Sequence, residues 1–275
     1  MMTCLRIIVL TSCLFVLADR PVLAAESLPP SRKKGIGLVV GPTNGWHEKL
    51  KALNCHWFYS WWFETPANMP ADVEFVPMIW GPGPRTASAY RKLTEEHRAG
   101  RHQVLLGFNE PDVLEEANLS VEKALQVWPK LLRTGIRLGS PAAAHPERRW
   151  MEEFMRGAKE QNYRVDFVAV HSYGGTDVAA FLEGLARVHE KFQRPLWITE
   201  LGVADWDARD HQASRYSPAD VNKFMAAAIP ALEKLDYVER YAWYPAPTKD
   251  RLLGASALFD EAGNLTELGR LYSTF

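Results

Sequence analysis

Cysteine is scarce in this sequence of 275 residues, which contains only Cys4, Cys13 and Cys55. The first two lie in an N-terminal segment that we expect to be removed, so no disulfide can form within the mature chain. We interpret Cys55 as a buried thiol that packs as a small apolar side chain. The sequence also lacks a cysteine cluster, an H-E-x-x-H pattern and any metal-ligand spacing among its histidines, so we expect no metal site.

Several motifs that would define other function classes are missing as well. Without a G-x-S-x-G pattern, a serine hydrolase would have no recognisable nucleophile. The segment "GIGLVV" (35–40) does not complete a G-x-G-x-x-G pattern, and no Walker-type lysine motif follows, so we expect no nucleotide and no other cofactor. The net charge of −1 and the lack of a basic block argue against binding to nucleic acid or to an anionic membrane surface.

The N-terminal 25 residues have the pattern of a secretory signal peptide. Arg6 precedes an apolar run over 7–17, and "VLAA" (22–25) offers a cleavage site with small residues. The run is shorter than the roughly 20 residues that a membrane-spanning helix needs. We therefore predict a secreted or periplasmic protein, with lipoprotein processing at Cys13 as the alternative. Residues 26–34 are interpreted as a linker and residues 35–275 as a single domain.

Short runs rich in β-branched and aromatic residues recur through that domain and predict eight strands. They lie at 35–41, 56–62, 75–80, 104–108, 137–141, 165–173, 195–201 and 237–244. Segments with helical periodicity separate them, and their ends carry helix signals. Thr86 and Gly100 bound one such segment, Ser120 and Gly135 bound another, and "SPAD" (217–220) opens a third.

Strands that alternate with helices indicate right-handed βαβ units and a parallel sheet. The strands are nearly continuous apolar runs, as is typical of strands covered on both faces. Eight units in about 250 residues match the usual size of a (β/α)₈ TIM barrel. We therefore predict a single-domain α/β barrel, with an open doubly wound sheet as the alternative.

Functional groups of such a barrel collect at the carboxyl ends of its strands, and two glutamates stand at these positions. Glu110 follows "LLGFN" (105–109) and precedes Pro111. Because proline disfavours the α region for the preceding residue and lacks an N–H, we expect Glu110 to be extended, as the last residue of its strand. The alternative is a glutamate that caps the next turn or pairs with a basic neighbour.

Glu200 lies inside the apolar strand "PLWITELGV" (195–203), so it must sit at the strand mouth or be buried and paired. The ends of the fourth and seventh strands lie nearly opposite each other in a barrel of eight. Two carboxyl groups that face each other across an open mouth suit glycoside hydrolysis, in which one protonates the leaving oxygen while the other attacks the sugar carbon. On rigid strand ends we favour a separation of about 5 Å, which predicts a covalent intermediate and retained configuration.

Other residues near the strand ends are candidates for sugar binding. Asn109 could bond the hydroxyl next to the reacting carbon, although asparagine is also common in turns. His171 and Tyr173 share one strand face and could donate to Glu200, although His171 could equally be a satisfied core residue. Flat aromatic surfaces for sugar rings are expected from Trp61, Trp80 and Trp243, with Asn44 as a further contact. We expect the side chains of Trp57, Trp128 and Trp197 to lie in the core.

Five segments of the sequence resemble glycoside hydrolase family 128, whose members are clan A (β/α)₈ endo-β-1,3-glucanases. They are "WFYSWW" (57–62), "LLGFNEPD" (105–112), "VAVHSYGG" (168–175), "LWITELGV" (196–203) and "GASALFDEAGNLTELGRLY" (254–272). The NEP and TELG pieces are shared across much of clan A, whereas the first and last segments are specific to this family. The likeness covers about residues 35–272.

The resemblance implies that Glu110 is the acid/base and Glu200 the nucleophile of a retaining enzyme, with Asn109, His171 and Tyr173 near the reacting sugar. It implies the same position for Trp243. The chain departs from the family at Ser60, where asparagine is expected, which affects subsite detail and leaves the catalytic pair unchanged. The expected partner is a β-glucan, the default oligomeric state is a monomer, and the product lengths stay open. The alternatives are a clan A hydrolase of another β-linked glucan or xylan, or a secreted β-glucan-binding protein without turnover.

Overall fold

The computed structural model describes residues 31–208 and 214–275, so the predicted signal peptide lies outside the described residues. The first strand, β1 (Lys34–Gly37), begins inside the segment predicted to be a linker. Lys34 is fully buried, and its Nζ donates to the backbone oxygens of Tyr272 (3.1 Å) and Phe275 (2.6 Å). A buried lysine needs hydrogen-bond partners, and Lys34 finds them near the other end of the chain. Lys34 is thus part of the folded domain, which begins before residue 35.

A strand overlaps each of the eight predicted strand segments, although the third strand shares only Phe75 with its segment (75–80). After β1 they are β2 (Trp57–Tyr59), β3 (Glu74–Phe75), β4 (Val104–Leu105), β5 (Arg137–Leu138), β6 (Val168–Gly174), β7 (Leu196–Val203) and β8 (Val238–Trp243). They pair in parallel, in one sheet of order β3-β2-β1-β8-β7-β6 and a second of β4-β5. Single parallel bridges lie between the two sheets. One joins Met78, after β3, to Leu106, after β4. The other joins Gly139, after β5, to Phe167, before β6.

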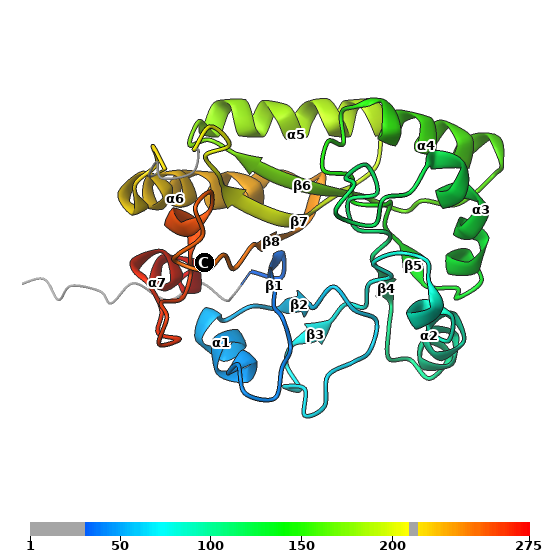
Figure 1. Ribbon diagram of the computed structural model, residues 1–275, viewed down its shortest axis with the longest axis horizontal. Coiled ribbons are helices and arrows are strands. Elements are labelled where there is room, and N and C mark those ends of the chain that lie inside the picture. Colours follow the sequence, from blue (N-terminus) through cyan, green and yellow to red (C-terminus); the bar gives the residue numbers. More distant parts are fainter. Residues whose placement is uncertain (1–30, 209–213) are drawn as a thin grey trace, which may run out of the picture.

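Helices follow the strands and lie outside them (Figure 1). They are α1 (Trp46–Leu53), α2 (Ala89–Arg98), α3 (Val121–Leu132), α4 (Arg149–Glu160), α5 (Val178–Phe192), α6 (Pro218–Lys234) and α7 (Glu267–Ser273), with 3-10 turns η1 (Pro84–Thr86) and η2 (Gly254–Ser256). The predicted caps are confirmed at Ser120, whose hydroxyl accepts from Lys123 N, and at Ser217, which forms a capping box with Asp220. None of the helices in the described ranges is long and apolar enough to cross a membrane.

A layer of large aromatic side chains fills the space between the strands. The ring of Phe167 stacks on Trp197 at 4.5 Å between centroids, and Trp57 lies 5.3 Å from Trp197. The Arg240 guanidinium covers Trp197 at 4.4 Å and pairs with Glu74 at 2.6 Å. Burial of Trp57 and Trp197 confirms two predicted core positions, and Trp128 is buried in the helix layer as expected. This layer gives the residues at the carboxyl ends of the strands a rigid base.

Cys55 is buried, as the sequence predicts. Burial raises the pKa of its thiol to about 12, with the Lys34 charge acting in the opposite direction. The thiol is therefore protonated at neutral pH and behaves as an apolar side chain.

Candidate active site

Glu110 reaches the carboxyl end of the strands through a turn, not as the extended residue that we predicted. Its backbone has φ of 37°, in the left-handed region. Proline does disfavour the right-handed α region for Glu110, but the extended region is not the only alternative. The N–H of Glu110 donates to Ala142 O at 2.8 Å, and its carbonyl accepts from Val113 N at 3.1 Å. These two bonds compensate a conformation that costs a non-glycine residue roughly 1–3 kcal/mol.

Asp112 holds the turn after Glu110 against the chain that follows β5. Its carboxylate accepts from the backbone N–H of Ala144 at 2.8 Å and of His145 at 3.2 Å. The loops after β4 and β5 are thus fixed to each other next to Glu110. Strained backbone that is held this firmly is typical of functional sites.

Glu200 lies in β7 and is 5% exposed, so its charge needs partners. Its Oε1 accepts from Trp61 Nε1 at 2.7 Å and from the Tyr59 hydroxyl at 3.2 Å. The Tyr173 hydroxyl donates to Oε2. Burial, followed by the negative charge of Glu200, raises the pKa of Tyr59 and of Tyr173 well above the usual tyrosine value. Both hydroxyls therefore stay protonated, and together with the Trp61 indole they hold the Glu200 carboxyl group in place.

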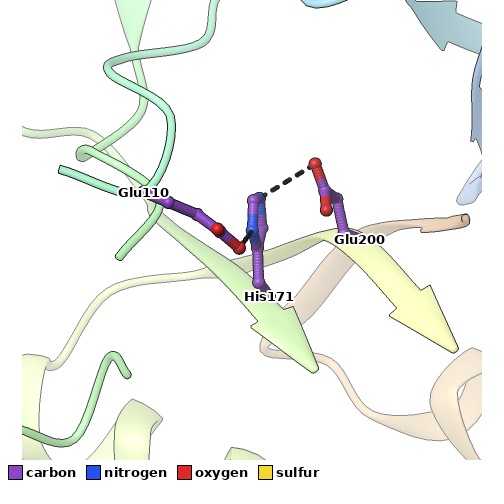
Figure 2. Close-up of side chains that lie close together, drawn as sticks. All are labelled: Glu110, His171 and Glu200. Atoms are coloured by element: carbon purple, nitrogen blue, oxygen red, sulfur yellow. Dashed lines mark hydrogen bonds and ion pairs between the residues drawn. The ribbon is translucent and has the colours of Figure 1, made fainter. Parts of the chain in front are cut away.

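His171 stands between the two glutamates (Figure 2). Its Nδ1 lies 2.7 Å from Oε1 of Glu110, and its Nε2 lies 3.5 Å from Oε1 of Glu200. Burial lowers the pKa of His171, but the charge of Glu200 and the hydrogen bond to Glu110 outweigh it and leave the pKa above its usual value. His171 and Tyr173 therefore both face the carboxylate pair, as their spacing on one strand predicts.

The side chains of Glu110, His171 and Glu200 are also the one group, among the residues that the structure describes, whose spacing would suit a metal ion. One ligand atom from each lies within 4.8 Å of the others. Two carboxylates and an imidazole can bind a divalent cation, but a hydrogen bond to Glu110 already engages Nδ1 of His171. The arrangement can equally hold and transfer protons without a metal, which chelation tests directly.

The two glutamates open into a pocket of about 880 Å³. Among the predicted residues that line it are Asn109, Trp61, Trp80 and Tyr173. Large apolar surfaces that surround a few convergent polar groups are the usual composition of a ligand site.

Three predicted contacts do not line this pocket. His171 lines an adjoining hollow instead, next to the carboxylate pair. Trp243 is fully buried, and its indole Nε1 donates to Ser256 O at 2.8 Å. Successive side chains along a strand point to opposite faces, so the next residue, Tyr244, lines the pocket instead. Asn44 stabilises its own loop, because its Nδ2 donates to Val39 O at 2.6 Å and its Oδ1 accepts from Gly41 N at 3.2 Å. It lines a neighbouring hollow of about 440 Å³.

The sequence interpretation missed three residues of the site. Tyr59 donates a hydrogen bond to Glu200. Alternate residues of a strand share one face, so the positions of Trp57 and Trp61 could have revealed Tyr59. Glu116, a third carboxylate in the pocket, lies in a turn without any sequence signal. Trp206 is 61% exposed beside the pocket, and its Nε1 donates to Tyr173 O at 2.7 Å. Its signal was its place just after the strand that carries Glu200.

Known proteins share this sequence and this structure. Residues 37–272 match the family described as Glycosyl hydrolase catalytic core. A subgroup I endo-β-1,3-glucanase of glycoside hydrolase family 128 from Amycolatopsis mediterranei, solved with laminaritriose, is 34% identical with a TM-score of 0.75. The match covers 88% of this chain and 99% of that chain. The chain belongs to glycoside hydrolase family 128.

The chain is also similar to other proteins. A subgroup III curdlan-specific exo-β-1,3-glucanase from Blastomyces gilchristii is 27% identical with a TM-score of 0.70, over 90% of this chain and 100% of that chain. Alkali-sensitive linkage protein 1 of Schizosaccharomyces pombe is 26% identical over 88% of this chain, which spans 44% of the length of that protein. This family 128 chain is a glycoside hydrolase with an α/β fold built on parallel strands.

Proposed function

We propose that this glycoside hydrolase is a retaining endo-β-1,3-glucanase, with Glu110 as the acid/base and Glu200 as the nucleophile. One observation carries the assignment. The two carboxylates approach each other so closely that one oxygen from each, together with a His171 nitrogen, falls within 4.8 Å. Retaining enzymes place their carboxyl groups about 5–5.5 Å apart, whereas inverting enzymes need about 6.5–9.5 Å to admit a water molecule.

In the first step of the proposed reaction, Glu200 attacks the anomeric carbon while Glu110 protonates the departing glycosidic oxygen. The hydrogen bonds from Tyr59, Trp61 and Tyr173 direct the oxygens of Glu200 toward the sugar. His171, hydrogen-bonded to Glu110, orients that carboxyl group and can exchange a proton with it. The product is an ester between the sugar and Glu200.

In the second step, esterification removes the charge of Glu200, and Glu110 can then act as the base. Glu110 takes a proton from water as the water attacks the anomeric carbon, and Glu200 leaves as a carboxylate. The same three donors now stabilise the departing charge. Two inversions at one carbon leave the product in the configuration of the substrate.

The substrate assignment draws on the relatives and on the shape of the cleft. The Amycolatopsis mediterranei enzyme was solved with laminari-oligosaccharides, also after its glutamates were replaced. In this chain the central pocket shares Ala144, His145 and Tyr173 with a second hollow. It shares a different set of residues, Val39, Pro245 and Pro247, with a third hollow. Space that adjoins the pocket at two separate places can admit more of a polysaccharide than one sugar ring, which supports endo action.

Trp206 is proposed as a platform for a sugar ring in this cleft. The hydrogen bond from its indole to the Tyr173 backbone fixes the ring, while 61% of the residue stays exposed. An aromatic ring that is oriented and uncovered can pack against the apolar face of a pyranose. Trp61, Trp80 and Tyr244 supply further aromatic surface around the same pocket.

The proposal includes a closed (β/α)₈ barrel and export of the protein from the cytoplasm. The bridges from Met78 to Leu106 and from Gly139 to Phe167 support closure, because they lie between the two sheets. The pattern of residues 1–25 supports secretion, and N-terminal sequencing of the mature protein checks the cleavage site. We propose a monomer, which light scattering tests.

Hydrolysis of laminarin tests the proposal most directly. We expect new reducing ends, and proton NMR should show that the initial product has the β configuration. A 2-deoxy-2-fluoro-β-laminaribiosyl fluoride should label the protein, with the added mass on the peptide that contains Glu200. Glu110→Gln and Glu200→Gln should each abolish hydrolysis with little change in melting temperature. Cleavage of β-1,4-glucan or xylan but not of laminarin would refute the substrate assignment, and an α product would refute the mechanism.

A further inference from the structure

Asn109 lines the catalytic pocket, and another side chain holds its amide group. Its Nδ2 donates to Oε2 of Glu116 at 3.1 Å. Its Oδ1 is buried and accepts no hydrogen bond from the residues that the structure describes. Nδ2 carries two hydrogens, so one goes to Glu116 and one is left for a ligand in the pocket. The amide therefore offers a donor, not an acceptor, next to Glu110.

Glu116 is brought to Asn109 by the turn that follows the catalytic glutamate. The N–H of Glu116 donates to Val113 O at 3.3 Å, and the N–H of Ala117 donates to Asn109 O at 3.3 Å. The chain thus folds back on itself, and the Glu116 carboxylate lines the same pocket as Asn109 and Glu110.

We propose that Glu116 is a positioning residue, which selects the orientation of the Asn109 amide that presents Nδ2 to the sugar bound by the proposed enzyme. The two orientations of an asparagine amide have nearly the same shape, so packing alone does not distinguish them. An ionised carboxylate only accepts hydrogen bonds. A flipped amide would place Oδ1 against Glu116, acceptor against acceptor, and would remove the donor from the pocket.

Two features indicate that this selection matters. The observed orientation leaves Oδ1 without a partner, which is unfavourable for a buried oxygen and needs a compensating interaction. Glu116 also lines the same pocket as Glu110 and Glu200, and burial followed by the Glu110 charge raises its pKa, while the Asn109 hydrogen bond and His171 act in the opposite direction. A glutamine would avoid this repulsion, but its amide could pair with Asn109 in either orientation. Only the carboxylate enforces one.

The consequence for the reaction lies at the sugar hydroxyl beside the reacting carbon. A hydrogen bond to this 2-hydroxyl strengthens in the transition state of glycoside hydrolysis. Loss of the Glu116 charge should therefore weaken the hydrogen bond from Asn109 to the 2-hydroxyl. Hydrolysis of sugars without a 2-hydroxyl should be unaffected. This inference rests on the proposed function.

The test compares Glu116→Gln with Glu115→Gln, an exposed neighbour in the same turn that undergoes the same change. The two substrates are 2,4-dinitrophenyl β-laminaribioside and its 2-deoxy counterpart. In the 2-deoxy substrate, hydrogen replaces the 2-hydroxyl of the sugar that bears the leaving group. Dinitrophenolate leaves without a proton, so kcat/KM does not report on protonation of Glu110. For Glu116→Gln we expect kcat/KM to fall about tenfold on the complete sugar and to stay within about twofold on the deoxy sugar. Glu115→Gln should change neither.

The other outcomes are distinct. An equal loss on both substrates would assign Glu116 a purely structural role, and no loss on either would show that the amide needs no carboxylate; both would overturn the inference. If the unaltered protein hydrolyses neither substrate, the proposed function fails and the inference with it.

Discussion

Replacement of Tyr173 by phenylalanine should slow the second step of the proposed reaction more than the first. Among the described residues, Tyr173 is the only side chain that donates to Oε2 of Glu200. When the intermediate breaks down, Glu200 leaves as a carboxylate, and this hydrogen bond stabilises the developing charge. When the intermediate forms, the charge of Glu200 is consumed, so the same bond contributes less.

The size of the effect follows from the contact that is lost. A hydrogen bond to a charged group contributes about 1.5–3 kcal/mol, which corresponds to roughly a ten- to hundredfold decrease in kcat. The ring itself stays packed, since Tyr173 contacts Tyr244 at 5.6 Å and Trp206 at 6.3 Å between centroids. With 2,4-dinitrophenyl β-laminaribioside we expect a burst of dinitrophenolate followed by a slow steady state. Intact-protein mass spectrometry should detect the accumulated glycosyl-enzyme.

Tyr59→Phe provides the matched control. The Tyr59 hydroxyl is shared between Thr199 O at 3.0 Å and Oε1 of Glu200 at 3.2 Å. That oxygen keeps its bond from Trp61 at 2.7 Å, so kcat should fall less than in Tyr173→Phe. The reasoning is refuted if Tyr173→Phe lowers kcat/KM as much as kcat and no intermediate accumulates.

Three further predictions concern the platform, the histidine and the metal. Trp206→Ala should raise KM for laminarihexaose about fivefold through lost stacking and leave the melting temperature unchanged; an unchanged KM would exclude the platform. Burial lowers the pKa of His171 but the Glu200 charge and the Glu110 hydrogen bond raise it more, so nitrogen NMR should find His171 protonated at pH 6.5. Its contribution to stability should be complete below pH 6.5 and decrease as pH rises through the raised pKa; a titration below 6.5 would contradict this. Dialysis against EDTA should leave laminarin hydrolysis intact, and a loss that divalent cations restore would show that hydrolysis requires a metal.

The sequence alone predicted the alternation of strands and helices, and it predicted that Glu110 and Glu200 lie close together. These features depend on local patterns: apolar β-branched runs, serine caps such as Ser120 and Ser217, and acidic residues where apolar runs end. Their causes act within a few residues along the chain. The predicted extended backbone conformation of Glu110 is wrong. The hydrogen bond from Glu110 N to Ala142 O and the hydrogen bonds that Asp112 accepts decide that conformation. The partners of these bonds, Ala142, Ala144 and His145, lie in the chain after β5, so the local pattern around Pro111 does not show them.

The tertiary structure alone decided which side chains meet. The register of β8 against β7 shifts between Ile198 and Leu201, and the chain buries Trp243 while it turns Tyr244 toward the pocket. His171 and Glu110 are 61 positions apart, and Trp61 and Glu200 are 139 apart. Local sequence determines which residues stand at strand ends, because hydrophobic periodicity and capping are short-range. The hydrogen bonds that orient those residues join distant segments, so only the packing of the strands around their aromatic core determines them.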